Sequence, residues 1–351
     1  MCNLEEKIDK NKWRKANTNS VFILKIGYGF AQSFSHKDSQ ILELDNRIIK
    51  TMAQKKILVI GSSNTDMTIK ADKLPVPGET ILGGRFIMGP GGKGANQAVA
   101  ARRLGGNVEF ICKVGHDIFG DNALAGYRKE GIEIGHTLYS GEASGIALIL
   151  VDGTGENVIS VAPGANGDIT VEDIESVADV IRDADFLILQ LEIPIPAVLR
   201  AAKIAHEAGV YVILNPAPAC KLPEELFSYI SLVTPNQTES AIMTGIEVKD
   251  EASREEAVAA FNRMGVKDVI VTLGCNGSLV CTGGQKTLIP AKKVKAVDAT
   301  AAGDTFCGAV CVALSEGRSL VEAAEFATKA SALTVQKMGA QNSIPFITDI
   351  N

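Results

Sequence analysis

The chain has 351 residues, of which 46% are hydrophobic and 22% are charged, and its formal net charge is -6. This composition is typical of a globular protein with one large core or two modest ones, and it excludes a fibrous or disordered chain. The acidic balance argues against a broad nucleic-acid-binding surface, which needs an excess of lysine and arginine, so small molecules are the expected partners.

Residues 1–51 differ from the rest of the chain, because they contain nine lysine or arginine residues against six acidic ones. Their apolar stretch, SVFILKIGYGFAQSF, is too short for a membrane span and lacks a small-residue cleavage site, so no secretory signal is expected. The stretch MAQKKILVIG is typical of a chain start that leads into a strand. We therefore interpret residues 1–51 as an N-terminal extension, poorly ordered or not native, before a domain at residues 52–351. Organelle targeting is the less favoured interpretation, since acidic residues are frequent.

From Lys55 onward, short apolar runs alternate with amphipathic segments. Continuous apolar runs indicate strands that are covered on both faces, so we expect an α/β domain with a parallel sheet. Strands are predicted at residues 55–61, 107–115, 185–193, 210–218, 230–237 and 268–274, and helices at 171–184, 195–209 and 253–265.

Two stretches depart from this alternation. Residues 66–89 and 144–164 are rich in strand formers and turns, and the second contains Asp152-Gly153, a dipeptide typical of tight hairpins. We expect β-ribbons that form a small sheet off the main one.

A glycine-dense stretch, GPGGKGANQAVAARRLG, occupies residues 89–105. It matches G-x-G-x-x-G, but a dinucleotide loop should follow the first strand directly, and this stretch does not. It is not a phosphate loop either, because glycine follows the lysine where serine or threonine is required. Lys93, Asn96 and Gln97 instead bring ammonium and amide groups to a helix predicted from Asn96, which suits a hydroxyl-rich ligand. The alternative is a loop needed only for turning, with Asn96 as the helix cap.

Residues 297–317, VDATAAGDTFCGAVCVALSEG, are predicted to begin as a strand, turn, and continue as an apolar helix with Asp304 in its first turn. Small residues at a helix N-terminus expose N–H groups that favour an anion. A carboxylate beside such a site suits phosphoryl transfer, in which the acid takes the proton of the attacking hydroxyl. The alternative is that Asp304 only caps its helix.

The seven cysteines are scattered and form no C-x-x-C pair, which is typical of a reduced cytoplasmic protein without structural zinc. Cys307 and Cys311 lie one helical turn apart among apolar residues, and we expect them to pack in the core.

Eight short motifs follow one another at compatible spacings: NTD at 64–66, GGKGANQAVAA at 91–101, LQLE at 189–192, NPAPA at 215–219, TPNQTE at 234–239, TLGCNG at 272–277, AAGDTF at 301–306 and GAQNS at 339–343. From about Lys55 to Pro345 the chain thereby resembles the ribokinase-like carbohydrate kinases, and among them those that phosphorylate D-ribose. The resemblance implies a three-layer α/β/α fold with a mostly parallel central sheet and a small β-sheet lid. Ala299 and Cys307 depart from the usual threonine and asparagine, without removing a catalytic group.

The resemblance also implies an ATP-dependent kinase that converts D-ribose to D-ribose 5-phosphate, with Asp304 as the general base. The implied anion hole is formed by Ala301, Ala302 and Gly303. The sugar would be bound by Asn64, Asp66, Gly92, Lys93, Asn96, Glu192 and Asp304. The nucleotide would be bound by Asn236, Thr272, Gly274, Gly277, Gly303 and Asp304. Magnesium would be held through water by Asn236 and Glu239, although Glu239 is alternatively an ordinary acid in a first helical turn. A potassium ion would be held by Asp298, Thr300, Thr334, Lys337, Gly339 and Ser343.

In the family the two ribbons form a lid over the sugar, and apolar ribbons such as GIALILV imply a homodimer joined through the lids. A relative that acts on deoxyribose, fructose or a nucleoside is one alternative. A non-catalytic sugar or nucleotide sensor is another, but a sensor would not need the base and the small-residue loop that this chain retains. No nucleic-acid or membrane partner is expected.

Overall fold

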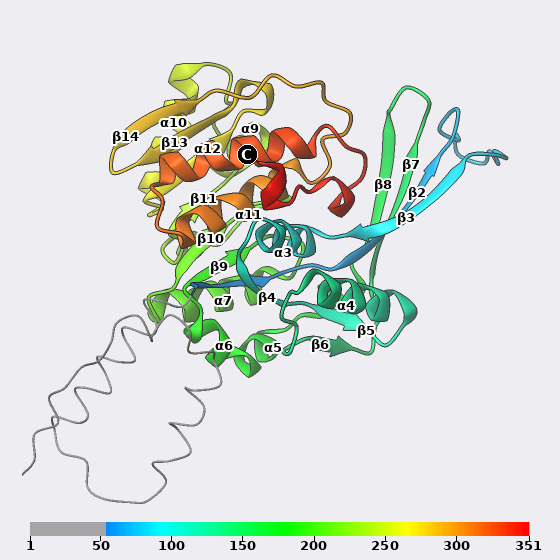
Figure 1. The fold of residues 1–351 in the computed structure, drawn as a ribbon, viewed down its shortest axis with the longest axis horizontal. Coiled ribbons are helices and arrows are strands. Elements are labelled where there is room, and N and C mark those ends of the chain that lie inside the picture. Colours follow the sequence, from blue (N-terminus) through cyan, green and yellow to red (C-terminus); the bar gives the residue numbers. More distant parts are fainter. Residues whose placement is uncertain (1–53, 351) are drawn as a thin grey trace, which may run out of the picture. The chain divides into compact units, whose positions relative to one another are not determined.

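The computed structural model of the protein describes residues 54–350 (Figure 1). The extension predicted at residues 1–51 lies outside the described residues. Within residues 54–350, no helix is both long enough and apolar enough to cross a membrane.

An eight-stranded sheet has the order β14-β13-β12-β11-β10-β9-β1-β4. The strands from β12 to β4 run parallel, which confirms the mostly parallel sheet, and β13 and β14 add an antiparallel hairpin that was not predicted. The strands are β1 (Lys56–Ile60), β4 (Asn107–Ile111), β9 (Phe186–Leu189), β10 (Tyr211–Leu214), β11 (Leu232–Val233), β12 (Asp268–Thr272), β13 (Ser278–Thr282) and β14 (Gln285–Ile289).

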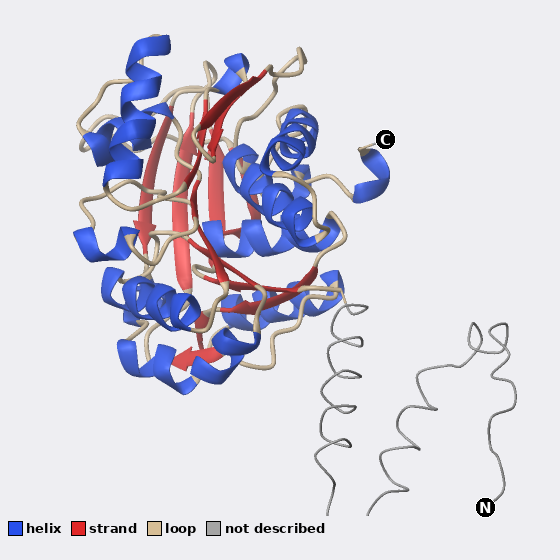
Figure 2. Cartoon of the chain, turned by 90° about the vertical axis from the view of Figure 1, so that its left-hand side faces the viewer, coloured by secondary structure: helices blue, strands red, loops and turns tan. Residues whose placement is uncertain are grey.

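Helices cover both faces of this sheet (Figure 2). Because successive side chains of a strand point to opposite faces, each strand contributes to two apolar clusters. In β1, Ile57 and Val59 belong to one buried apolar cluster, and Leu58 and Ile60 belong to the other. The first face is covered by α3 (Lys93–Arg103), α4 (Ile118–Glu130), α11 (Ala302–Ser315) and α12 (Leu320–Thr334). The second is covered by α5 (Val171–Ser176), α6 (Ala178–Asp183), α7 (Ile195–Glu207), α8 (Glu224–Phe227), α9 (Gln237–Thr244) and α10 (Glu251–Arg263). The fold is therefore the expected three-layer α/β/α arrangement.

Three predicted elements differ from the observed ones. The helix predicted over residues 171–184 is divided into α5 and α6 at Val177, whose φ of -112° and ψ of 13° are not helical. The strand predicted from Val297 does not form, because the Val297 N–H donates to the Val335 carbonyl after α12 and not to a neighbouring strand. The helix of the glycine-dense stretch begins at Lys93, which is earlier than predicted. The smaller elements are β5 (Lys113–Gly115), β6 (Leu138–Ser140), η2 (Gly164–Asp168), η3 (Gly274–Asn276), η4 (Gln341–Ser343) and η5 (Ile347–Asp349).

A second sheet, which we call the lid sheet, projects beside the main one (Figure 1). Its strands have the order β3-β2-β7-β8, and they are β2 (Asn64–Lys70), β3 (Arg85–Gly91), β7 (Gly145–Val151) and β8 (Asn157–Ala162). The register places Asp66, Ala147 and Val161 in one row on one face of the lid sheet. Met67 and Leu148 lie in the adjacent row, on the opposite face.

Candidate active site

A cavity of about 400 Å³ lies where the parallel strands end and the lid sheet covers them. Glu192 follows β9, Asn236 follows β11 and Thr272 ends β12, so the cavity lies at the carboxyl edge, where α/β sheets commonly bind ligands. The site residues predicted from the sequence that line this cavity are Asn64, Asp66, Gly92, Lys93, Asn96, Glu192, Asn236, Glu239, Thr272, Thr300, Ala301, Gly303 and Asp304. Those that lie outside its lining are Ala302, Gly274, Gly277, Asp298, Thr334, Lys337, Gly339 and Ser343.

The start of α11 leaves backbone N–H groups open to the cavity. Ala301 has a φ of 61° and is the only non-glycine residue among residues 54–350 with a positive φ. The first N–H groups of a helix have no intrahelical partner, and no side chain of the described residues caps α11. The N–H groups of Ala301 and Gly303 are therefore left for a ligand. There is open space where a Cβ of Gly303 would stand. The Ala302 N–H, in contrast, donates to the Ala299 carbonyl at 3.2 Å, so this member of the predicted anion hole is already paired.

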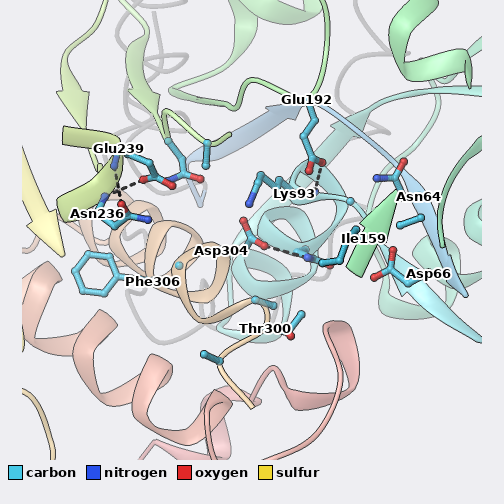
Figure 3. Close-up of a pocket in the computed structure, with 18 of the residues that line it drawn as sticks. Asn64, Asp66, Lys93, Ile159, Glu192, Asn236, Glu239, Thr300, Asp304 and Phe306 are labelled. Atoms are coloured by element: carbon cyan, nitrogen blue, oxygen red, sulfur yellow. Dashed lines mark hydrogen bonds between the residues drawn. The ribbon is translucent and has the colours of Figure 1, made fainter. Parts of the chain in front are cut away.

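Asp304 is buried at this helix start, and both oxygens of its carboxylate accept hydrogen bonds from α3, one of which is drawn in Figure 3. Asn96 Nδ2 donates to Oδ2 and Gln97 Nε2 donates to Oδ1, each at 3.0 Å. Burial raises the pKa of Asp304 above its usual value, although Lys93 and the two amides act in the opposite direction. The alternative in which Asp304 caps α11 is wrong, because its carboxylate faces α3 and not its own helix end. A raised pKa suits a group that takes a proton from a hydroxyl.

The first turn of α3 is capped by a side chain from the segment that follows β9. The Glu192 carboxylate accepts the Lys93 backbone N–H at 2.9 Å and the Ser62 hydroxyl at 2.6 Å. Asn96 therefore lies inside the helix, and the alternative in which it is the cap is wrong. A Cβ on Gly92 would stand 2.8 Å from the Asn64 backbone nitrogen, which is why glycine is required at this close approach.

Lys93 brings the positive charge of the cavity. Burial lowers the pKa of its ammonium, but the attraction of Asp304, Glu192 and Glu239 outweighs that effect and raises the pKa above 10.5. The side chain is therefore a permanent donor among acceptors, which is the mixture that a hydroxyl-rich ligand needs.

Asn166, in η2, sets the orientation of the Asn64 amide. Asn166 Oδ1 accepts the Ser63 N–H at 2.8 Å, so its Nδ2 must be the atom that donates to Asn64 Oδ1 at 2.7 Å. The Asn64 Oδ1 is thereby occupied, and its Nδ2 remains to donate to a ligand. A Cβ on Gly145 would stand 2.1 Å from Asn166 Nδ2, so glycine is needed where β7 passes this pair.

Asp66 lies two rows further along the lid sheet than Asn64, on the same face, and it faces the same cavity (Figure 3). Burial, followed by the repulsion of Glu192 and Asp304, raises its pKa from 3.8 to about 6. Its carboxylate occupies the space where a Cβ of Gly91 would stand, at 2.3 Å from both oxygens. The site thus holds a carboxylate in surroundings that disfavour its charge.

The opposite end of the cavity holds Asn236 and Glu239 (Figure 3). They form a capping box at the start of α9, in which Asn236 Oδ1 accepts the Glu239 N–H and Glu239 Oε2 accepts the Asn236 N–H, each at 2.8 Å. The interpretation of Glu239 as an acid in a first helical turn therefore holds, and its second oxygen stays available. In the described part of the chain, no three histidine, cysteine or acidic side chains gather in a way that would hold a metal ion.

The residues predicted for a monovalent cation lie on two segments that hydrogen bonds join. Asp298 Oδ2 accepts the Gly339 N–H at 2.9 Å, and its Oδ1 accepts the Thr300 N–H at 2.9 Å. Ser343 and Thr334 are buried in the second segment. Arg103, at the end of α3, ties this segment to the core, because it donates to the Gln341 carbonyl at 2.6 Å. Asp298 Oδ1 also accepts the Thr300 hydroxyl at 2.6 Å and is fully used, whereas Oδ2 keeps a lone pair. Together with backbone carbonyl oxygens of the two segments, that oxygen would fit an alkali cation.

Several cavity residues were not predicted from the sequence to be site residues. Apolar side chains of the lid sheet could be anticipated only as ribbons, and Ser62 and Asn166 gave no local signal because their partners are distant in the chain. The residues concerned are Ala147, Ile149, Ile159, Val161, Asn215, Ala217, Thr234, Ala299 and Phe306 in the lining, with Ser62 and Asn166 behind it.

Comparison with known proteins gives a family match over nearly all the described residues. The model of the pfkB family of carbohydrate kinases matches residues 54–347. The chain is 42% identical to the ribokinase of Staphylococcus aureus, over 84% of this chain and 98% of that one. It is 45% identical to the bifunctional ribokinase/ribose-5-phosphate isomerase A of Fructilactobacillus sanfranciscensis, over 83% of this chain but only 54% of that protein. The structure of Arabidopsis thaliana ribokinase complexed with ribose and ATP is similar with a TM-score of 0.79, at 32% identity, over 85% of this chain and 98% of that one.

Proposed function

The chain belongs to the pfkB family of carbohydrate kinases, and we propose that it transfers the γ-phosphoryl group of ATP to the 5-hydroxyl of D-ribose, giving D-ribose 5-phosphate and ADP. One observation carries this proposal. A buried carboxylate, Asp304, lies in a single cavity with the unpaired N–H groups of a helix start and with a set of hydroxyl-binding side chains. Relatives whose names include ribokinase, at 42% identity or more, support ribose as the sugar, and the ribose and ATP complex of the Arabidopsis thaliana enzyme supports ATP as the donor.

The reaction forms one bond and breaks one. The sugar hydroxyl oxygen attacks the γ-phosphorus, the bond from that phosphorus to the oxygen of the leaving ADP breaks, and Asp304 takes the hydroxyl proton. The free N–H groups of Ala301 and Gly303 stabilise the charge on the moving phosphoryl group. Because the Asp304 oxygens already accept from two amides, the carboxylate is held in place before the substrate arrives.

Recognition of the sugar in this proposal uses both donors and acceptors of the cavity. Asn64 and Lys93 donate, whereas Asp66 and the free oxygen of Glu192 accept, and the Gly92 backbone and Asn96 complete the set. A sugar that lacks a matching hydroxyl leaves one of these buried groups unpaired and is therefore rejected.

Asn236, Thr272, Gly274 and Gly277 bind the nucleotide in this proposal. The free carboxylate oxygen of Glu239 fits magnesium that keeps most of its water, and magnesium would supply charge neutralisation on the phosphates. Potassium would bind between the segments 298–300 and 334–343 and hold the start of α11 in position. Its ligands would come from Asp298, Thr300, Thr334, Lys337, Gly339 and Ser343, mostly through their backbone carbonyl oxygens.

The protein acts as a homodimer joined through the lid sheet in this proposal. The lid face that points away from the cavity carries Phe86, Met88, Leu148 and Val158, each more than half exposed. An apolar face of this kind on a two-sided sheet needs a cover, and a second copy supplies the same face. The unpaired cysteines among residues 54–350 support a reducing compartment, the cytoplasm.

The test is an ADP-coupled assay with ribose, deoxyribose, fructose and adenosine as acceptors. Ribose is expected to give the highest kcat/KM, with phosphate found on carbon 5 of the product. Turnover with adenosine but not with ribose would overturn the choice of substrate. Ribose binding without ADP formation from any acceptor would instead support the sensor.

A further inference from the structure

Gln97 is fully buried next to Asp304 and forms the centre of a chain of side-chain amides. Its Nε2 donates to Asp304 Oδ1 and to Asn215 Oδ1, each at 3.0 Å, while its Oε1 accepts from Gln190 Nε2 at 2.7 Å. Each atom of the Gln97 amide that can form a hydrogen bond is thus in use. The side chain does not line the cavity, and the proposed reaction gives it no direct role.

A backbone carbonyl fixes the direction of the hydrogen bonds along this series of side-chain amides. Asn215 Nδ2 donates to the Thr234 carbonyl at 3.1 Å, which can only accept, so Asn215 must present its Oδ1 to Gln97. Gln97 must then present its Nε2, and the second proton of that nitrogen faces Asp304. A flipped amide at Gln97 would bring its Oε1 against both Asp304 Oδ1 and Asn215 Oδ1, so repulsion between these oxygens excludes the alternative orientation.

We propose, on the basis of the kinase function above, that Gln97 is a positioning residue that fixes the Asp304 carboxylate in its reactive orientation. Asn96 holds the other oxygen, but it also lines the cavity and is available to the sugar, so its bond to Asp304 can change when a ligand binds. Gln97 has no such second partner in the cavity. It is the contact that holds Asp304 in both the free and the bound state.

Loss of this donor has two effects that can be measured separately. The carboxylate gains freedom, which lowers kcat, and it loses a hydrogen bond to its charged form, which raises its pKa. The charged groups that act on Asp304 from the surrounding elements are Lys93, Glu192, Asp66 and Glu239, with the Cys307 thiol behind it, and all are retained when Gln97 is replaced.

The experiment compares Gln97→Met and Gln97→Glu with the wild-type chain. Gln97→Met is expected to lower kcat about 10- to 100-fold, which corresponds to the usual contribution of a hydrogen bond to a charged group. KM for ribose and for ATP should change less than about threefold, since Gln97 does not line the cavity. Gln97→Glu places two carboxylates in contact, so one proton is shared and the acid limb of kcat moves to higher pH, with activity partly restored at alkaline pH.

Tyr211→Phe is the matched control. It also removes one hydrogen bond to an aspartate, from the Tyr211 hydroxyl to Asp268 at 2.9 Å, but at the opposite edge of the sheet. Its kcat and pH profile should equal those of the wild type. A Gln97→Met enzyme with kcat within threefold of wild type, or a Gln97→Glu enzyme with an unmoved acid limb, overturns the proposal.

The proposal for Gln97 can also be tested in two further cases. If Gln97→Met does not fold, the pH profile of the near-isosteric Gln97→Glu decides alone. If the wild-type enzyme prefers another sugar to ribose, the proposed substrate fails, but the same comparison made with that sugar still tests Gln97.

Discussion

Asp66→Asn is expected to make the ligand-free protein more stable and the enzyme worse. The folded protein raises the pKa of Asp66 from 3.8 to about 6, so folding disfavours the charged form. Between pH 3.8 and about pH 6, this carboxyl group binds more protons in the folded protein than in the unfolded chain. The free energy of unfolding therefore falls as the pH rises through this range. Above about pH 7 the full cost is present, and it is at most about 3 kcal/mol, since each tenfold change in an equilibrium constant is worth about 1.4 kcal/mol.

Asparagine has almost the shape of the protonated acid and carries no charge, so the substitution removes this cost. We expect the variant to gain up to about 3 kcal/mol of unfolding free energy at pH 8 and about half of that at pH 5, where wild-type Asp66 is already mostly protonated. Urea unfolding at the two pH values measures the difference. Asp179→Asn is the control, because it makes the same chemical change at a side chain that is 99% exposed.

The gain in stability should be accompanied by a loss of sugar binding. Asp66 is the acceptor for a ribose hydroxyl in the proposed site, so KM for ribose should rise about 10- to 100-fold with KM for ATP unchanged. For the same reason, wild-type KM for ribose should rise about tenfold from pH 8 to pH 5, as the ionised fraction of Asp66 falls. An Asp66→Asn variant that is no more stable at pH 8, or equally more stable at both pH values, would refute the reasoning.

Asp304→Asn should lower kcat by about 10²- to 10⁴-fold in the ADP-coupled assay while ATP binding, measured by calorimetry, is retained; near-normal turnover would exclude Asp304 as the base. Asn166→Asp keeps the acceptor for the Ser63 N–H but turns the Asn64 amide round, so KM for ribose should rise about tenfold. An equal rise in KM for ATP would contradict that role. Leu148→Lys places a charge on the outer lid face and should convert the dimer to a monomer in sedimentation velocity. Wild-type protein that sediments as a monomer at micromolar concentration would contradict the dimer itself.

The layers of the fold could be predicted from the sequence because apolar runs and amphipathic segments each report a local property. The parallel strands β1, β9 and β10 and the helix α7 lie where the pattern placed them. The edge hairpin was missed, although Gly283-Gly284 between two strand-like runs was an available signal.

The candidate site was less accessible from the sequence, because tertiary contacts decide its details. The start of α3 depends on Glu192, which caps it from almost a hundred residues away. The orientations of Asn64 and Asp304 depend on Asn166 and Gln97 in the same way. Motifs identified which residue types gather here, but hydrogen-bond direction follows from neighbours that no spacing rule connects.

The position of Asn64 and Asp66 on the lid sheet has a consequence for how such enzymes diversify. Both lie in the first rows of β2, where the strand leaves the three-layer body, while most of the outer apolar face lies further along the strands. Insertions, deletions or surface changes near the lid tips can therefore alter assembly without disturbing the groups that read the sugar. Quaternary structure and substrate choice are free to evolve separately on this scaffold.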